Sequence, residues 1–305
     1  MPIARSNGVD LFYEDQGPRD GPAILLIMGL GTQMIAWPDT FRDGLVARGF
    51  RVVSYDNRDI GRSTALAGAL MPGVLWTALA AKLRLPLRLA YSLTDMARDA
   101  IGLLDALEIS AAHFVGASMG GAIAQIAAAE FPDRVASLTS IMATSGAPGL
   151  PGPPPALRRQ LMKKRPPSAT RAEAATIGAD VARLLAYPDP ARPAEAFRLA
   201  AERAYDRGFN PDGIRRQLLA IIADGSRADR LPRITAPTLV IHGAADRLVP
   251  LACGQDVAHR IPGARLEVIE AMAHDLPPSQ IDTLVLLIAK HASGAAADDA
   301  KHRPA

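Results

Sequence analysis

The chain has 305 residues, of which 49% are hydrophobic and 21% charged, with a net charge of +3, and this globular composition excludes a disordered chain. Lysine and arginine form no stripe interleaved with aromatics, and the basic run at 213–217 is read as a solvated helix face, so we expect no nucleic-acid partner. The single cysteine, Cys253, rules out an internal disulfide, and the lack of a signal peptide or of about 20 consecutive apolar residues predicts a cytoplasmic protein with no membrane span.

The first half of the chain predicts strands and helices in alternation. Asn7-Gly8 is a strong two-residue turn signal between alternating segments, so residues 3–15 are expected to form a β-hairpin. The apolar run at 23–31 is typical of a strand buried on both faces, as in a parallel sheet. The elements expected next are a helix at 41–50, a buried strand at 51–56, a helix at 95–109 capped by Thr94, and a strand at 112–116 followed at once by another helix.

The second half continues the same alternation. Further strands are predicted at 135–144, 237–243 and 264–270, and a closing helix at 280–292. Strands that alternate with helices imply that a mostly parallel sheet lies at the centre of the molecule. Together with the hairpin, these segments predict an α/β fold with a mostly parallel eight-stranded sheet flanked by helices.

Two segments interrupt this pattern. Residues 64–92 form a first insert, and residues 147–230, which begin with a proline-rich stretch, predict three or four helices. Since the second segment lies between two predicted strands, we expect a helical cap of residues 147–230 inserted into a core of residues 1–146 and 231–292. The small polar residues 293–305 are expected to be a flexible C-terminal tail.

One serine stands among small residues in the stretch "HFVGASMGGAIAQIAAAE". The pattern Gly116-x-Ser118-x-Gly120 lies between a predicted strand and a predicted helix, which is the context of a nucleophile elbow. The small neighbours would let strand and helix approach closely, and the amides at the helix N-terminus would face a developing oxyanion. We therefore predict that Ser118 is a catalytic nucleophile.

A serine hydroxyl needs a base and an orienting acid, and this kind of elbow places them later in the chain, the acid before the histidine. His274 lies in a loop directly after the last predicted strand and is the predicted base; His242, at a strand end, remains the alternative. Asp246 follows the strand "LVIHG" in a short polar loop and is the predicted acid. Asp275 is set aside, because adjacent side chains rarely orient one another.

The oxyanion would need two backbone donors. One is predicted to be the Met119 amide, directly after the nucleophile, and the other the Leu30 amide in the glycine-rich loop "MGLG". Four further residues are candidates for contact with substrate: Gln33, Met34 and Trp37 after this loop, and Trp76 in the first insert, whose alternative role is packing against the cap.

The ordered set "LLIMGLG", "SYDNRDIGRS", "VGASMGGAIAQ", "LVIHGAADRLVP" and "AMAHDLP" resembles the α/β-hydrolase superfamily, over most of the chain. Within it, "MGLGTQMIAWP" and "YDNRDIGRST" look most similar to the bacterial esterases around aclacinomycin methylesterase. Relatives usually have a histidine where this chain has Met28, which implies a more apolar oxyanion loop. Asp56 and Arg58 resemble the structural ion-pair turn of the family.

The resemblance implies a serine carboxylesterase that acts on small-to-medium esters through a catalytic triad. Serine at position 118 argues against haloalkane dehalogenases and epoxide hydrolases of this fold, which use aspartate there. Hydrolysis of C–C bonds and cofactor-free perhydrolysis use the same triad and stay open, as does, more distantly, a ligand receptor without activity. No cofactor and no metal are expected. The expected partner is a small-molecule ester, and the apolar inserts leave a homo-oligomer open.

Overall fold

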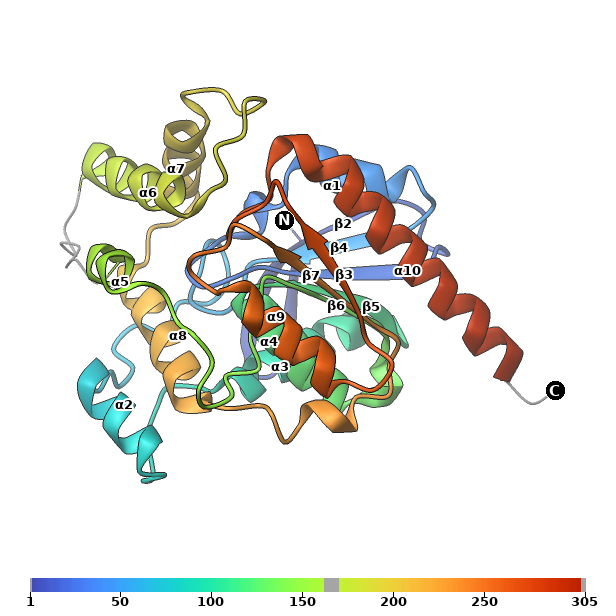
Figure 1. Ribbon diagram of the computed structural model, residues 1–305, viewed down its shortest axis with the longest axis horizontal. Helices are drawn as coiled ribbons and strands as arrows, with labels where there is room; N and C mark the ends of the chain where they lie inside the picture. Colours follow the sequence, from blue (N-terminus) through green and yellow to red (C-terminus); the bar gives the residue numbers. More distant parts are fainter. Residues whose placement is uncertain (1, 162–169, 303–305) are drawn as a thin grey trace.

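A computed structural model describes residues 2–161 and 170–302. Its centre is an eight-stranded sheet with the order β1-β2-β4-β3-β5-β6-β7-β8 (Figure 1). The pairs β1–β2 and β2–β4 are antiparallel, whereas the strands from β4 to β8 are parallel, which confirms the predicted mostly parallel sheet. The strands are β1 (Ile3–Ser6), β2 (Val9–Gln16), β3 (Ala23–Ile27), β4 (Arg51–Tyr55), β5 (Ala112–Ala117), β6 (Val135–Ile141), β7 (Thr238–Gly243) and β8 (Arg265–Ile269).

Helices cover both faces of this sheet. Side chains alternate between the faces along each strand, so Ile24 and Leu26 of β3 pack with α1 and α10, while Leu25 and Ile27 pack with α3, α4 and α9. This burial on both sides explains why β3 is continuously apolar. The helices of the core are α1 (Asp39–Val46), α3 (Leu93–Ala106), α4 (Met119–Glu130), α9 (Leu251–Arg260) and α10 (Ile281–His302), with short 3-10 turns η1 (Met34–Ala36), η2 (Pro132–Arg134), η3 (Leu231–Arg233) and η4 (Pro278–Gln280).

The predicted hairpin is present, but one predicted helix cap is wrong. Asn7 and Gly8 both have positive φ, as the tight turn between β1 and β2 requires. Helix α3 is capped by Ser92 and not by Thr94. The Ser92 hydroxyl accepts from the Asp95 amide and the Asp95 carboxylate accepts from the Ser92 amide, a reciprocal pair that starts the helix two residues earlier than expected.

The two inserts lie together on one side of the sheet (Figure 1). Between β6 and β7, the described residues form four helices, and α2 of the first insert packs against the last of them. Within the long insert, α6 and α7 pack closely against each other. The bounds are α2 (Val74–Lys82), α5 (Pro155–Leu161), α6 (Arg171–Leu185), α7 (Ala196–Arg207) and α8 (Pro211–Asp224).

The last helix continues further than expected. The sequence favoured a flexible tail at 293–305, whereas α10 extends to His302. The segment is rich in alanine, the residue with the highest helix propensity, which accounts for the continuation. No helix within residues 2–161 and 170–302 is both long enough and apolar enough to cross a bilayer.

Candidate active site

Ser118 stands at a sharp turn between β5 and α4. Its φ is +56° and its ψ −117°, a conformation that side-chain-bearing residues rarely adopt and that is typical of strained functional positions. The glycines on either side make the turn feasible. A Cβ on Gly116 would lie 2.2 Å from the Gly120 carbonyl oxygen, and one on Gly120 would lie 2.0 Å from the carbonyl oxygen of Ile27. The small residues around Ser118 are thus required by the close approach of three backbone segments.

Ser118, His274 and Asp246 form a continuous chain of hydrogen bonds. His274 Nε2 lies 3.0 Å from Ser118 Oγ, and His274 Nδ1 lies 2.8 Å from Asp246 Oδ2. Since a carboxylate only accepts, Nδ1 carries the proton and Nε2 is free to accept the serine proton. The Asp246 side chain has no exposed surface, and its Oδ1 accepts from the amides of Leu248 and Val249, both at 2.9 Å. The arrangement can hold a neutral imidazole as a base toward the serine hydroxyl.

His242, the alternative base, lies behind Asp246 and away from the serine. Its Nε2 donates to the Val249 carbonyl at 2.7 Å and is 3.7 Å from Asp246 Oδ2. Burial lowers the pKa of His242, and its ring has no exposed surface. The structure gives His242 no hydrogen bond to Ser118, whereas His274 has one.

The glycine-rich loop after β3 passes directly over the serine. A Cβ at Gly29 would lie 3.2 Å from Ser118 Cβ. The amides of Leu30 and Met119 have no acceptor among the residues that the structure describes, so both are available as donors. The next amide in the loop, that of Gly31, is instead occupied, because it donates to Gln217 Oε1 at 2.9 Å.

Gln217 belongs to α8 and was not recognised from the sequence. The run 213–217 was expected to be a solvated helix face, and this prediction was wrong, since Arg216 and Gln217 are both buried. Arg216 makes a bidentate pair with Asp59 at 2.8 Å, and Gln217 Nε2 donates to the Arg58 carbonyl at 3.0 Å. The basic residues of this run indicated a solvent-exposed face, whereas Arg216 and Gln217 bind the core through polar contacts.

The four substrate-contact candidates differ in their positions. Gln33 lines a cavity of about 150 Å³, but its Nε2 also donates to the carbonyls of Ala204 and Gly208, so it fastens α7 to the core. The remaining three do not line this cavity. Met34 and Trp37 have no exposed surface, and the Trp37 indole stacks on the Phe41 ring within the core, with the ring centroids 5.1 Å apart. Trp76 is instead 53% exposed on α2. The expectation of a pocket position fails for Trp37, since η1 and α1 turn its ring inward.

The small cavity lies between the oxyanion loop and the long insert. Gly31 and Ile60 contribute from the core, and the other walls come from α6, α7 and α8. Most of these wall residues are small or apolar, among them Ala174, Gly178 and Ile214. The walls of this cavity are thus mostly small or apolar, and none of Ser118, Asp246 and His274 lines it.

Asp56 and Arg58 were expected to form an ion-pair turn, but each binds another partner. The Asp56 carboxylate accepts from the amides of Met34 and Arg62 and faces Arg207 of α7. The guanidinium of Arg58 donates to the buried carboxylate of Asp99. Both residues are scaffold, as expected, although they do not pair with each other.

The loop of His274 is held by the long insert. The His274 amide donates to the Leu185 carbonyl at 3.1 Å, at the end of α6. The next carboxylate, Asp275, accepts from the Tyr187 amide at 3.0 Å and from the guanidinium of Arg192 at 2.5 Å. No pattern in the sequence pointed to this contact, because its two sides are more than 80 residues apart in the chain.

Metal-ligating residues do not gather in the described part of the chain. No group of three or more His, Cys, Asp or Glu side chains that could hold a metal ion occurs there. Cys253 is buried, and its thiol contacts the Pro151 carbonyl at 3.4 Å.

Comparison with known proteins identifies the family and the fold of the chain. Residues 22–278 match the family described as alpha/beta hydrolase fold. The chain is 32% identical to the rhodomycin D methylesterase DnrP of Streptomyces peucetius, over 94% of this chain and 96% of that one. Two solved structures share the fold. They are the enol-lactonase from Burkholderia xenovorans LB400 (TM-score 0.71, 23% identity, 96% and 100% coverage) and the meta-cleavage product hydrolase from Pseudomonas fluorescens IP01 (TM-score 0.74, 21% identity, 97% and 98% coverage).

Proposed function

The chain belongs to the α/β-hydrolase fold family, and on this basis we propose that it is a serine hydrolase that cleaves small-to-medium carboxylic esters. The observation that carries the proposal is the hydrogen-bond chain from Ser118 through His274 to Asp246. A methylesterase that is 32% identical over nearly the whole chain supports hydrolysis of an ester.

In the proposed mechanism, His274 removes the Ser118 proton as Oγ attacks the ester carbonyl. Asp246 keeps the proton of Nδ1 directed toward itself and stabilises the imidazolium that forms. The amides of Leu30 and Met119 hold the oxyanion of the tetrahedral intermediate. His274 then gives its proton to the departing alcohol, and the acyl group stays on Ser118.

Deacylation repeats these steps with water. His274 takes a proton from water, whose oxygen attacks the acyl carbonyl, and returns the proton to Ser118 as the acid leaves. The same oxyanion donors serve both halves of the reaction. One water molecule is consumed for each ester cleaved, and the protons of Ser118 and His274 return to their starting positions.

We further propose that residues 147–230 act as a cap over this site. Two contacts support this role: the bond from Gly31 to Gln217, and the bond from the His274 amide to Leu185, both of which reach residues within the insert. The preference for small-to-medium esters rests on this covering position of the insert, because a covered site leaves little room for a long acyl chain.

The proposal is tested with a p-nitrophenyl ester series from acetate to palmitate. Wild type is expected to prefer the short esters, and Ser118→Ala is expected to lose activity by a factor of about a million, since the nucleophile is gone. Ser110→Ala, at an exposed serine remote from the site, serves as the matched control and should keep full activity. Circular dichroism verifies that each variant is folded.

Two results would contradict the proposal. Equal activity in wild type and Ser118→Ala would remove Ser118 as nucleophile. A wild type that is inert toward every ester, yet cleaves a vinylogous diketone, would replace ester hydrolysis by C–C bond hydrolysis on the same residues.

A further inference from the structure

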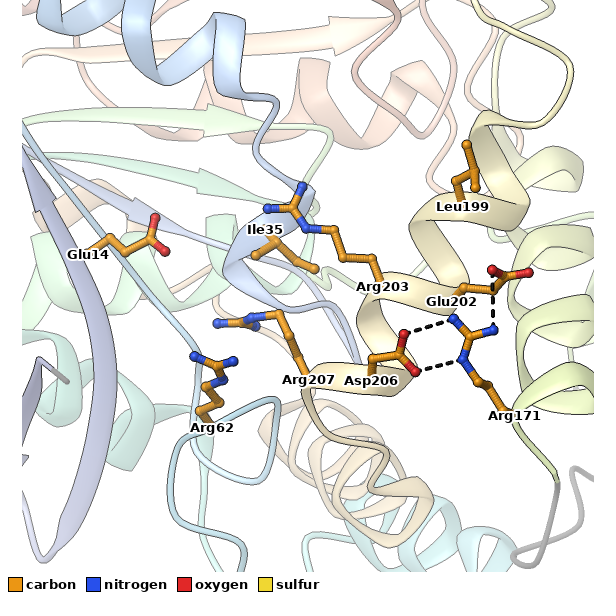
Figure 2. A pocket seen from close by; sticks show the side chains of 9 residues that line it. All are labelled: Glu14, Ile35, Arg62, Arg171, Leu199, Glu202, Arg203, Asp206 and Arg207. Atoms are coloured by element: carbon orange, nitrogen blue, oxygen red, sulfur yellow. Dashed lines mark hydrogen bonds and ion pairs between the residues drawn. The ribbon is translucent and has the colours of Figure 1, made fainter.

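A second cavity, of about 560 Å³, lies where α7 meets the core (Figure 2). Glu14 and Arg62 line it from the core, and the opposite wall comes from α6 and α7. None of Ser118, Asp246 and His274 lines it, so the cavity is separate from the candidate active site. The proposed ester hydrolysis assigns no role to the residues of this cavity.

Four arginines line this cavity, and only some of them form ion pairs with carboxylates. Arg171 is fully engaged, because it donates to both carboxylate oxygens of Asp206, at 2.7 and 2.8 Å, and lies 3.3 Å from Glu202. The guanidinium groups of Arg62 and Arg203 make no hydrogen bond or ion pair with any residue in the described ranges. The remaining acid in the wall, Glu14, binds Arg42, which lies outside the cavity lining.

Arg207 is buried and incompletely bonded. Its side chain is only 10% exposed. Nη1 donates to Gln33 Oε1 at 2.5 Å and to Asp56 Oδ1 at 3.3 Å. Nη2 lies 3.1 Å from Asp56 Oδ2 but without hydrogen-bond geometry, and it has no hydrogen-bond acceptor among the described residues. A buried donor without an acceptor is unfavourable, so the bonding of the Arg207 guanidinium within the described residues is incomplete.

Two of these arginines share one aromatic neighbour. The guanidinium carbons of Arg62 and Arg207 lie 5.2 and 5.4 Å from the centroid of the same ring, that of Phe12. Figure 2 shows the guanidinium groups of Arg203 and Arg207 directed toward the side where Arg62 lies, away from the Arg171 cluster. An anion between them would offset their repulsion, and the planar fork of arginine matches the oxygens of carboxylates and phosphates.

We propose that this cavity is a binding site for an anionic group, a carboxylate or a phosphate, held by Arg62, Arg203 and Arg207. Arg62 belongs to the core, whereas Arg203 and Arg207 belong to α7. A bound anion therefore links the two and fastens α7 to the core. Since Gln33 binds both Arg207 and the carbonyl of Ala204, this linkage ends beside the oxyanion loop.

The test measures thermal unfolding of the full chain in sodium phosphate, in sodium citrate and in sodium chloride of equal ionic strength. Either multivalent anion is expected to raise the Tm above its value in chloride by about 2 °C at a concentration tenfold above its Kd. A larger effect of citrate identifies a carboxylate ligand and a larger effect of phosphate identifies a phosphate ligand. Titration calorimetry with the same anion then gives the Kd directly.

Variants distinguish this cavity from general salt effects. Arg62→Gln and Arg203→Gln change exposed side chains that make no hydrogen bond or ion pair within the described residues, so both should fold and both should weaken anion binding at least tenfold. Arg159→Gln, at an exposed arginine of α5 outside both cavities, should bind as wild type does. The proposal is overturned if phosphate and citrate act no differently from chloride, or if all three variants bind the anion equally well. Neither result depends on whether the chain hydrolyses esters.

Discussion

The carboxylate of Asp275 binds the guanidinium of Arg192, 83 residues earlier in the chain, and not the imidazole of its neighbour His274. Both side chains are largely buried, with exposed fractions of 15% and 12%. The same carboxylate accepts from the Tyr187 amide. The loop that carries the proposed base is thus positioned by the long insert through a residue that does not itself reach the serine.

The contact of Asp275 with the insert leads to a first prediction. Asp275→Asn keeps an acceptor for the Tyr187 amide but removes the charge that pairs with Arg192, which leaves a largely buried cation without its counter-charge. The loop of His274 should lose its fixed position. We expect kcat for a short ester to fall by about tenfold with little change in KM, as when a catalytic group is misplaced rather than removed.

Arg183→Gln is the control for this prediction. It breaks an exposed ion pair with Asp180 on α6, and such pairs contribute little to stability. Steady-state kinetics on both variants show whether the contact of Asp275 with the insert affects kcat. If Asp275→Asn has wild-type kcat, or if its loss equals that of Arg183→Gln, then the insert does not position the base.

A second prediction concerns Gln217, which joins α8 to the oxyanion loop. In Gln217→Leu, the Gly31 amide and the Arg58 carbonyl would each lose a buried partner, at a cost of about 1–3 kcal/mol per group. The loop should relax and move the Leu30 amide away from the oxyanion. We expect kcat to fall about tenfold and the Tm to fall by several degrees.

The conservative variant Gln217→Glu separates positioning from general destabilisation. A carboxylate retains the acceptor for Gly31 but loses the donor to Arg58, so kcat should recover in part while the Tm stays low. Arg215→Gln, at an exposed neighbour on the same helix, should change neither value. Equal kcat in Gln217→Leu and Gln217→Glu would show that the Gly31 contact does not matter for the reaction.

The fold and the positions of the three proposed catalytic residues could be predicted because the information is local. The stretch around Ser118 requires small residues wherever strand, turn and helix approach one another, and those residues are visible in the sequence. Asp246 and His274 each follow a strand of the parallel sheet, and the carboxyl ends of such strands meet at one edge. The predicted eight-stranded α/β fold was confirmed for the same reason, since the central strands β3, β5 and β7 each carry a mostly apolar run.

Contacts of the long insert could not be predicted, because they depend on how it folds back onto the core. Arg216 and Gln217 are polar, and polarity alone indicates solvent exposure, yet both are buried against partners from 31 to 59. Trp37 shows the opposite error. Its position after the oxyanion loop indicated a pocket, but the short turn η1 directs the indole onto Phe41. In both cases the direction of a side chain is determined by tertiary structure and not by its neighbours in sequence.

The last prediction concerns the dependence of stability on pH, through His113 of β5. Burial, together with the charge of His291, lowers the pKa of His113 to about 4. In the unfolded chain a histidine takes up its proton near pH 6.5. Between these two values the unfolded state binds more protons than the folded state, so the free energy of unfolding decreases as the pH falls from about 6.5 toward 4.

The decrease in the free energy of unfolding with falling pH can be estimated, and a variant of His113 tests it. Each such histidine contributes up to about 1.4 kcal/mol per pH unit, and the buried His242 and His291, whose pKa values burial also lowers, add to His113. His113→Gln can keep the bond to the Ser137 hydroxyl but cannot take up a proton, so urea unfolding from pH 7 to pH 4.5 should show a shallower slope than wild type. His259→Gln, at an exposed histidine of α9, is the matched control and should retain the slope of wild type. If His113→Gln loses stability with falling pH as steeply as wild type does, then His113 is not a source of the acid sensitivity, whatever the absolute stability of the variant.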